Sequence, residues 1–165
     1  MNKIIVLLLL IQLSSCKTYT KFNMNELSQS DTIYHLDLSN RNLKTQPDLS
    51  KFTIIELNIS KNRITTFDEN KLPKGIQKLN FSHNRISKRV VFRKERNLES
   101  VNFSNNKMES FYFTNGIFKN LNLSNNKLVS IQMPLYNDKR ADTLNVANNL
   151  KLETTEINNI GFPRF

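Results

Sequence analysis

Apolar and polar residues alternate in a short segment that recurs six times along the chain. In each copy the first and third residues are apolar and the second is polar, and the starts of the copies are separated by 21, 22, 22, 20 and 23 residues. Such alternation predicts a short strand with one buried side. A near-constant period predicts a solenoid in which successive strands stack in parallel. The copies are Leu36–Leu43, Leu57–Ile64, Leu79–Ile86, Val101–Met108, Leu121–Leu128 and Leu144–Lys151.

Two further apolar positions extend the predicted core. One lies just upstream of the strand, as in Ile54 and Ile76, and the other is the eighth residue, as in Ile64 and Ile86. No single copy can bury its apolar face, so the stack has to build one continuous core. Between the copies, further apolar residues are expected on the opposite, convex side of the core. They are Phe67, Leu72, Val91, Phe92, Phe111, Phe113, Ile131 and Met133.

The copies read LDLSNRNL, LNISKNRI, LNFSHNRI, VNFSNNKM, LNLSNNKL and LNVANNLK. They resemble the leucine-rich-repeat family, whose core is L-x-L-x-x-N-x-L. The resemblance runs from Ile33 to about Ile160 and implies an α/β-type repeat solenoid, a horseshoe segment with a parallel β-sheet on its concave face. Because the repeats are short, we expect the convex side to be mostly irregular or built from single turns.

The sixth residue of the motif is the asparagine that points inward in this family and bonds the main chain of adjacent turns. It is Asn62, Asn84, Asn106, Asn126 and Asn149 here. The first copy has Arg41 instead, and the last has its closing apolar residue shifted to Leu152. We interpret both departures as features of terminal repeats, which are commonly atypical.

The N-terminus has the pattern of an export signal. Lys3 precedes an apolar stretch, Ile4–Leu13, which is too short to span a bilayer but fits a signal peptide. Leu13-Ser14-Ser15-Cys16 then resembles the lipobox of bacterial lipoproteins, which implies cleavage before Cys16 and acylation of that cysteine. An ordinary secretory signal with an incidental cysteine is the alternative. The predicted organisation is a signal peptide (1–15), a lipid-anchored tether and N-terminal cap (16–30), and a leucine-rich-repeat domain (31–165).

Composition and charge restrict the chemistry. The chain has 165 residues, a single cysteine and a net charge of +10. One cysteine cannot form a disulfide within the chain, and the two histidines, His35 and His83, lack the partners of a metal or nucleophile site. We therefore predict a protein that is not an enzyme and uses no cofactor or metal. No nucleic-acid-binding motif accompanies the basic charge.

The concave sheet is the usual binding face of the family. Three columns of side chains are predicted to point away from the core. The first two columns are nearly uniform, which favours a structural role. The third varies between repeats and is the more plausible surface for recognising a partner. The first column is Asp37, Asn58, Asn80, Asn102, Asn122 and Asn145; the second is Ser39, Ser60, Ser82, Ser104, Ser124 and Ala147; the third is His35, Glu56, Lys78, Ser100, Asn120 and Thr143.

A row of basic residues is the second candidate surface. Arg63, Arg85, Lys107 and Lys127 share the seventh position of four successive repeats, so they should form a ladder along one edge of the stack. It could hold an acidic polymer or lipid headgroups, or it could be a solvated edge of the kind common in the family. The denser run Lys88, Arg89, Arg93, Lys94 and Arg96 lies in a connecting segment and is interpreted as a solvated face.

Together these features predict a binding module anchored in the bacterial cell envelope. Its partner would be a protein or an acidic glycan, and its membrane contact would be the lipid anchor, with no nucleic-acid partner. A structural or assembly spacer in the envelope is the alternative. The sequence specifies neither the leaflet nor an oligomeric state.

Overall fold

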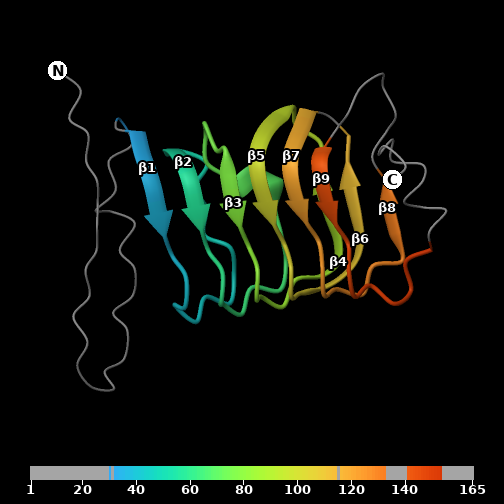
Figure 1. Ribbon diagram of the computed structural model, residues 1–165. Coiled ribbons are helices and arrows are strands. Elements are labelled where there is room, and N and C mark those ends of the chain that lie inside the picture. Colours follow the sequence, from blue (N-terminus) through green and yellow to red (C-terminus); the bar gives the residue numbers. More distant parts are fainter. Residues whose placement is uncertain (1–29, 31, 115, 133–140, 154–165) are drawn as a thin grey trace.

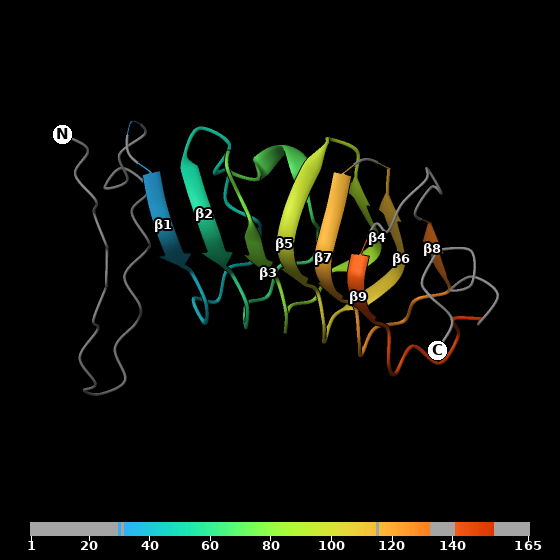
Figure 2. The ribbon, with the colours of Figure 1, turned by 45° about the horizontal axis from the view of Figure 1, so that its top comes forward.

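A computed structural model describes residues 30, 32–114, 116–132 and 141–153. Within them the chain winds into a β-solenoid whose strands are all parallel to their neighbours (Figures 1 and 2). The expected signal peptide, Cys16, Met133, and all of the tether but Ser30 lie outside the described residues, as does the segment after residue 153. The predicted parallel repeat solenoid is confirmed.

One strand from each repeat forms the main sheet, in the order β1-β2-β3-β5-β7-β9. The motif positions are in register throughout: His35 pairs with Glu56, Glu56 with Lys78, and Lys78 with Ser100. The same register continues to Asn120 and Thr143. The strands are β1 (Thr32–Asp37), β2 (Thr53–Asn58), β3 (Lys78–Asn80), β5 (Arg96–Asn102), β7 (Gly116–Asn122) and β9 (Ala141–Asn145).

A second parallel sheet covers the other side of the core in the later repeats. It consists of β4 (Ser87–Phe92), β6 (Lys107–Phe113) and β8 (Ser130–Gln132). The connection between β2 and β3 carries only a 3-10 turn, η2 (Glu69–Lys71). No α-helix occurs in the described residues. The expected irregular or single-turn convex side is thus right for the early turns and wrong for the later ones. The α/β class is not supported, because this is an almost purely β structure.

The core lies between the two layers and follows the predicted columns. The residues upstream of the strands, the strand apolar residues and the closing residues are almost all buried, as Ile54, Ile59 and Ile64 are in one turn. Its centre is aromatic: Phe103 stacks on Phe81 with centroids 5.3 Å apart, and Phe92 lies edge-on to Phe103 at 6.2 Å. Of the expected convex-side residues, Val91 is only half-buried and Val90 is buried in its place.

The inward asparagines bond the main chain as predicted. The Asn106 Nδ2 atom donates to the carbonyl oxygens of Phe81 and Phe103, both at 3.0 Å, and its Oδ1 accepts from the Ile86 N–H at 3.0 Å. Asn62, Asn84, Asn126 and Asn149 repeat this arrangement. No buried side-chain nitrogen or oxygen among the described residues lacks a hydrogen-bond partner. The loops can therefore stack tightly without leaving polar groups unpaired.

The fifth residue of each motif copy, which precedes the inward asparagine or Arg41, turns the chain. It has a positive φ in every copy, between 53° and 59°, in the left-handed region that favours glycine and asparagine. The chain has only 3 Gly, and asparagine occupies this position in four copies. Lys61 and His83 occupy it in the other two. The repeated Asn-Asn pairs therefore combine a turn residue with a core residue.

The terminal repeats depart from the motif as expected. The Arg41 N–H donates to Oδ1 of Asn62 at 2.9 Å, so the asparagine of the second copy serves the loop of the first. At the other end Leu150 is 99% exposed, while the half-buried Leu152 packs against the core and its N–H donates to the Asn149 carbonyl. The shifted closing residue is confirmed.

Candidate binding surfaces

The first column on the main sheet serves the backbone. The Oδ1 atom of Asn58 accepts from the N–H of Ser60 at 3.2 Å, and Asn80 and Asn102 do the same for Ser82 and Ser104. Asp37, Asn122 and Asn145 make the corresponding bond in their own copies. These bonds close the turn that follows each strand. The uniformity of this column is therefore explained by local structure.

The four inner members of the second column do not point into solvent as predicted. Ser60, Ser82, Ser104 and Ser124 are only 5–6% exposed, whereas Ser39 is half-buried and Ala147 is exposed. The carbonyl oxygen of each of the four buried serines accepts an N–H from the preceding turn, as Ser82 does from Lys61 at 3.0 Å. Turns this close leave room only for a small side chain, which is why serine recurs. The structure removes these four serines from the candidate binding surface.

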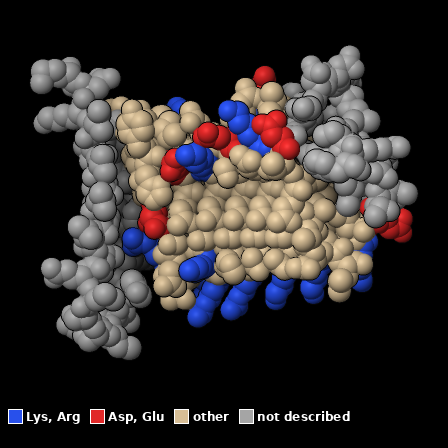
Figure 3. Space-filling view, in the orientation of Figure 1, with Lys and Arg blue, Asp and Glu red and all other residues tan. Residues whose placement is uncertain are grey.

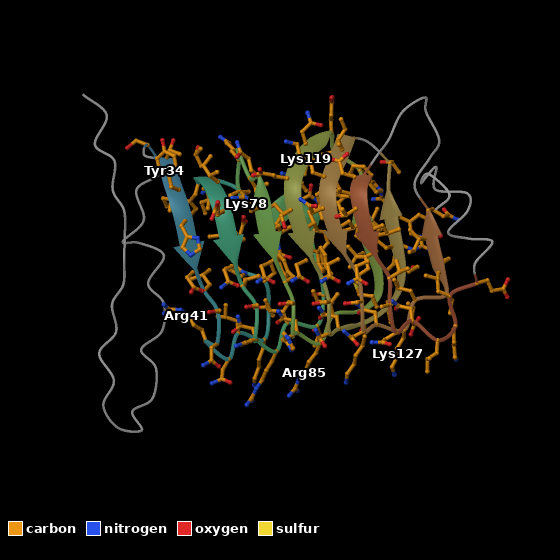
Figure 4. The ribbon with its side chains drawn as sticks, viewed as in Figure 1. Tyr34, Arg41, Lys78, Arg85, Lys119 and Lys127 are labelled. Atoms are coloured by element: carbon orange, nitrogen blue, oxygen red, sulfur yellow. The ribbon has the colours of Figure 1, made fainter. Side chains whose placement is uncertain are left out.

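The third column is exposed and carries paired charges. The Lys78 Nζ atom donates to Oε1 of Glu56 at 2.7 Å and lies 3.8 Å from the carboxylate of Glu99. The other Glu56 oxygen lies 3.4 Å from Nδ1 of His35. Further along the column, the Thr143 hydroxyl donates to Oδ1 of Asn120 at 2.8 Å. The predicted column is thus brought together as a continuous polar row across the main sheet (Figure 4 labels Lys78).

These contacts shift the pKa values of Glu56 and Lys78. The Lys78 ammonium, followed by His35, lowers the pKa of Glu56, and Glu56 raises the pKa of Lys78. Because the pKa of Glu56 is lowered on folding, its contribution to stability is present at neutral pH and is lost as the pH falls through its folded pKa. The contribution is small because the pair is largely exposed.

The predicted basic row is a ladder, hereafter the basic ladder: Arg63, Arg85, Lys107 and Lys127. Each backbone N–H donates to the carbonyl of the closing apolar residue of the preceding turn at 2.8–2.9 Å, so the four positions stack in register. All four side chains are exposed. Figure 3 shows the Lys and Arg side chains projecting side by side from this edge, and Figure 4 labels Arg85 and Lys127 there.

The run of basic residues from β4 to the start of β5 has a partly structural role that the sequence did not indicate. Glu69 is 8% exposed, and its carboxylate accepts the N–H groups of Arg93 at 2.8 Å and Lys94 at 3.0 Å. Arg96 approaches the same carboxylate at 3.3 Å with its side chain only 15% exposed. Arg89 lies over the ring of Tyr112, 4.4 Å from its centroid. Arg96 is therefore an anchor for the loop and not part of a solvated face.

A shallow cavity of about 300 Å³ opens beside this anchor. Phe67 and Val91 supply apolar lining, and Arg89, Arg93 and Lys94 contribute cations. Two of those cationic residues use their backbone to hold Glu69, so the cavity is a by-product of the junction between η2 and β4.

The described residues hold no group of three or more His, Cys, Asp or Glu side chains able to bind a metal ion. None of the helical structure within them has the length and hydropathy of a membrane span. Comparisons with protein-family models, with curated proteins and with solved structures found no match to this chain.

Proposed function

We propose that this protein is a leucine-rich-repeat binding module, exported and lipid-anchored through Cys16, which recognises a protein or glycan without catalysis. The motif and its inward asparagine support the family: six copies carry the L-x-L spacing, and five of them carry the asparagine that bonds adjacent turns. The export signal and lipobox support the location in a bacterial envelope.

The observation that carries the binding proposal is the exposed third column. Beside it, the first column is committed to backbone turns and the four inner serines of the second are buried. Of the three predicted columns, only the third therefore offers exposed side chains that differ from turn to turn at fixed spacing. A rigid row of this kind can match the polar groups of a partner without loop rearrangement. The Glu56–Lys78 pair at its centre is its most polarised part.

Exchanging the two charges tests this proposal. The double variant Glu56→Lys, Lys78→Glu keeps an ion pair across β2 and β3 but reverses its direction. Stability should change little, within about ±0.5 kcal/mol for such surface positions, whereas capture of the partner should be lost. The measurement compares material cross-linked to wild type and to the variant in cells that produce the protein, with thermal melting of each purified protein.

Lys51→Glu is the matched control, because Lys51 is exposed but outside the third column. It should capture the same partner as wild type. If the exchanged variant also captures it unchanged, the main sheet is not the recognition surface. If wild type captures nothing, the spacer role becomes the better account.

Cys16 provides a separate test of the anchor. Its thiol is the acceptor for the lipid, and several acyl chains give stable membrane attachment where one is marginal. Cys16→Ser should therefore abolish labelling by a radioactive fatty acid and leave the protein soluble or unprocessed. Cell fractionation and acyl labelling measure this. A wild-type protein that carries no acyl label, with the variant fractionating as wild type does, would refute the anchor.

A further inference from the structure

We propose that the basic ladder is a second binding site, which holds a linear acidic polysaccharide along the axis of the stack. This inference deepens the proposed recognition function by naming a ligand class. It assigns that ligand to an edge distinct from the third column of the main sheet.

The geometry of the ladder is fixed by the backbone. The four N–H groups of Arg63, Arg85, Lys107 and Lys127 donate to equivalent carbonyls of successive turns at 2.8–2.9 Å. Neighbouring positions are therefore about one strand spacing apart, roughly 4.8 Å. Side chains from such positions leave the edge in the same direction, as the row in Figure 3 shows. A straight chain of anionic groups lying along the edge could meet all four.

No ion pair within the described part of the chain neutralises the charge of the ladder. Among the described residues, the ion pairs join His35, Lys78 and Arg96 to carboxylates, and none involves a ladder residue. By contrast, the charged residues of the third column neutralise one another. Four like charges held side by side create a positive potential along the edge, and an anionic ligand would lower their mutual repulsion.

The residues beside the ladder favour a linear polymer over a membrane surface as its ligand. Two positions before the ladder residues lie Lys61, His83, Asn105 and Asn125, and two positions after them lie Thr65, Ser87, Glu109 and Val129. Helices that lie on membranes add apolar residues to a basic surface, whereas seven of these eight flanking residues are polar or charged and only Val129 is apolar. A line of cations with mostly polar borders fits a linear polymer better than lipid headgroups.

Binding of polygalacturonate to the purified soluble domain tests the proposal. The carboxylates of this polymer recur along an unbranched chain. Wild type should bind it, with affinity falling as salt rises because salt screens exposed charges. Reversing two ladder charges, Arg85→Glu with Lys107→Glu, should weaken binding by about tenfold or more, since two attractions become repulsions. A disaccharide, which cannot reach along the ladder, should bind much more weakly.

Three comparisons decide the outcome. Lys51→Glu with Lys74→Glu makes the same change in net charge at exposed sites elsewhere, and equal weakening by both pairs of substitutions would overturn the proposal. Stronger ladder-dependent binding to phosphatidylglycerol vesicles than to the polymer would also overturn it, in favour of membrane docking. The Glu56→Lys, Lys78→Glu variant should bind polygalacturonate as wild type does, so the ladder and the main-sheet surface can fail independently.

Discussion

Phe103→Ala is expected to lower the free energy of unfolding by about 3–5 kcal/mol, the usual cost of removing a fully buried phenylalanine ring. Phe103 is 0% exposed and is surrounded by other rings. Its centroid lies 5.2 Å from Phe67, 5.3 Å from Phe81 and 6.4 Å from Phe111. The stacked strands cannot close around the cavity without breaking the register of the main sheet, so little of the loss should be recovered by collapse.

Urea denaturation of the purified protein, followed by circular dichroism, measures this loss. Phe103→Leu should cost less, because leucine refills part of the volume. Ile117→Ala is the surface control, since Ile117 is 47% exposed. A loss below about 1 kcal/mol for Phe103→Ala would mean that the aromatic centre is not packed as described.

Asn106→Ala should be the most costly of the polar substitutions, at about 3 kcal/mol or more. The variant removes the partner of the Ile86 N–H and of the carbonyls of Phe81 and Phe103, whereas the Ser104 carbonyl keeps the N–H of His83. Each buried backbone group left unpaired costs about 1–3 kcal/mol. The cost falls on two adjacent turns, because the groups belong to both.

Asn106→Asp separates the two halves of this role. An aspartate keeps the acceptor for the Ile86 N–H but cannot donate to the carbonyls, so it should also be strongly destabilising. Lys107→Ala, one residue along and exposed, should change stability by less than about 0.5 kcal/mol. Melting of the three variants measures these effects. An Asn106→Ala protein that melts with wild type but fails to bind a partner would place Asn106 in the recognition surface instead.

The columns of the core could be predicted because equivalent apolar positions recur in all six copies of the motif. Ile54, Leu57, Ile59 and Ile64 each have an equivalent in the neighbouring turns, and equivalent residues stack on one another. The inward asparagine was predictable from the family resemblance for the same reason. A single copy of the motif would not have identified either feature.

The second sheet was not predictable from alternation alone. Lys88 adopts a left-handed φ of 61°, and the register of β4 against β6 shifts between Lys88 and Arg89. The pairing skips Glu109 of β6, so the buried positions of that strand change from Met108 to Phe111 and Phe113. A strand that changes register in this way has no simple period in its sequence.

The sequence predicted which residues of the candidate surfaces lie side by side, but not the contacts that their side chains make. Sequence spacing placed Glu56 beside Lys78 and aligned the ladder, and the register confirms both alignments. It could not show that Ser82 is enclosed by the next turn, or that Glu69 binds Arg96 from 27 residues away. Such pairings depend on how irregular loops fold back, which no periodic pattern encodes.

The asparagine hydrogen bonds that join one turn to another run in one direction along the chain. Asn84 donates to the carbonyl of Ile59 in the turn before it, and Asn106 donates to that of Phe81. Each loop is therefore completed by a residue that is synthesised about one repeat later. In a chain that folds from its amino end, the most recently formed turn has unpaired backbone carbonyls until the next turn packs against it. In a solenoid that assembles from its amino end, the last turn formed is therefore the place where a chaperone would find unpaired backbone.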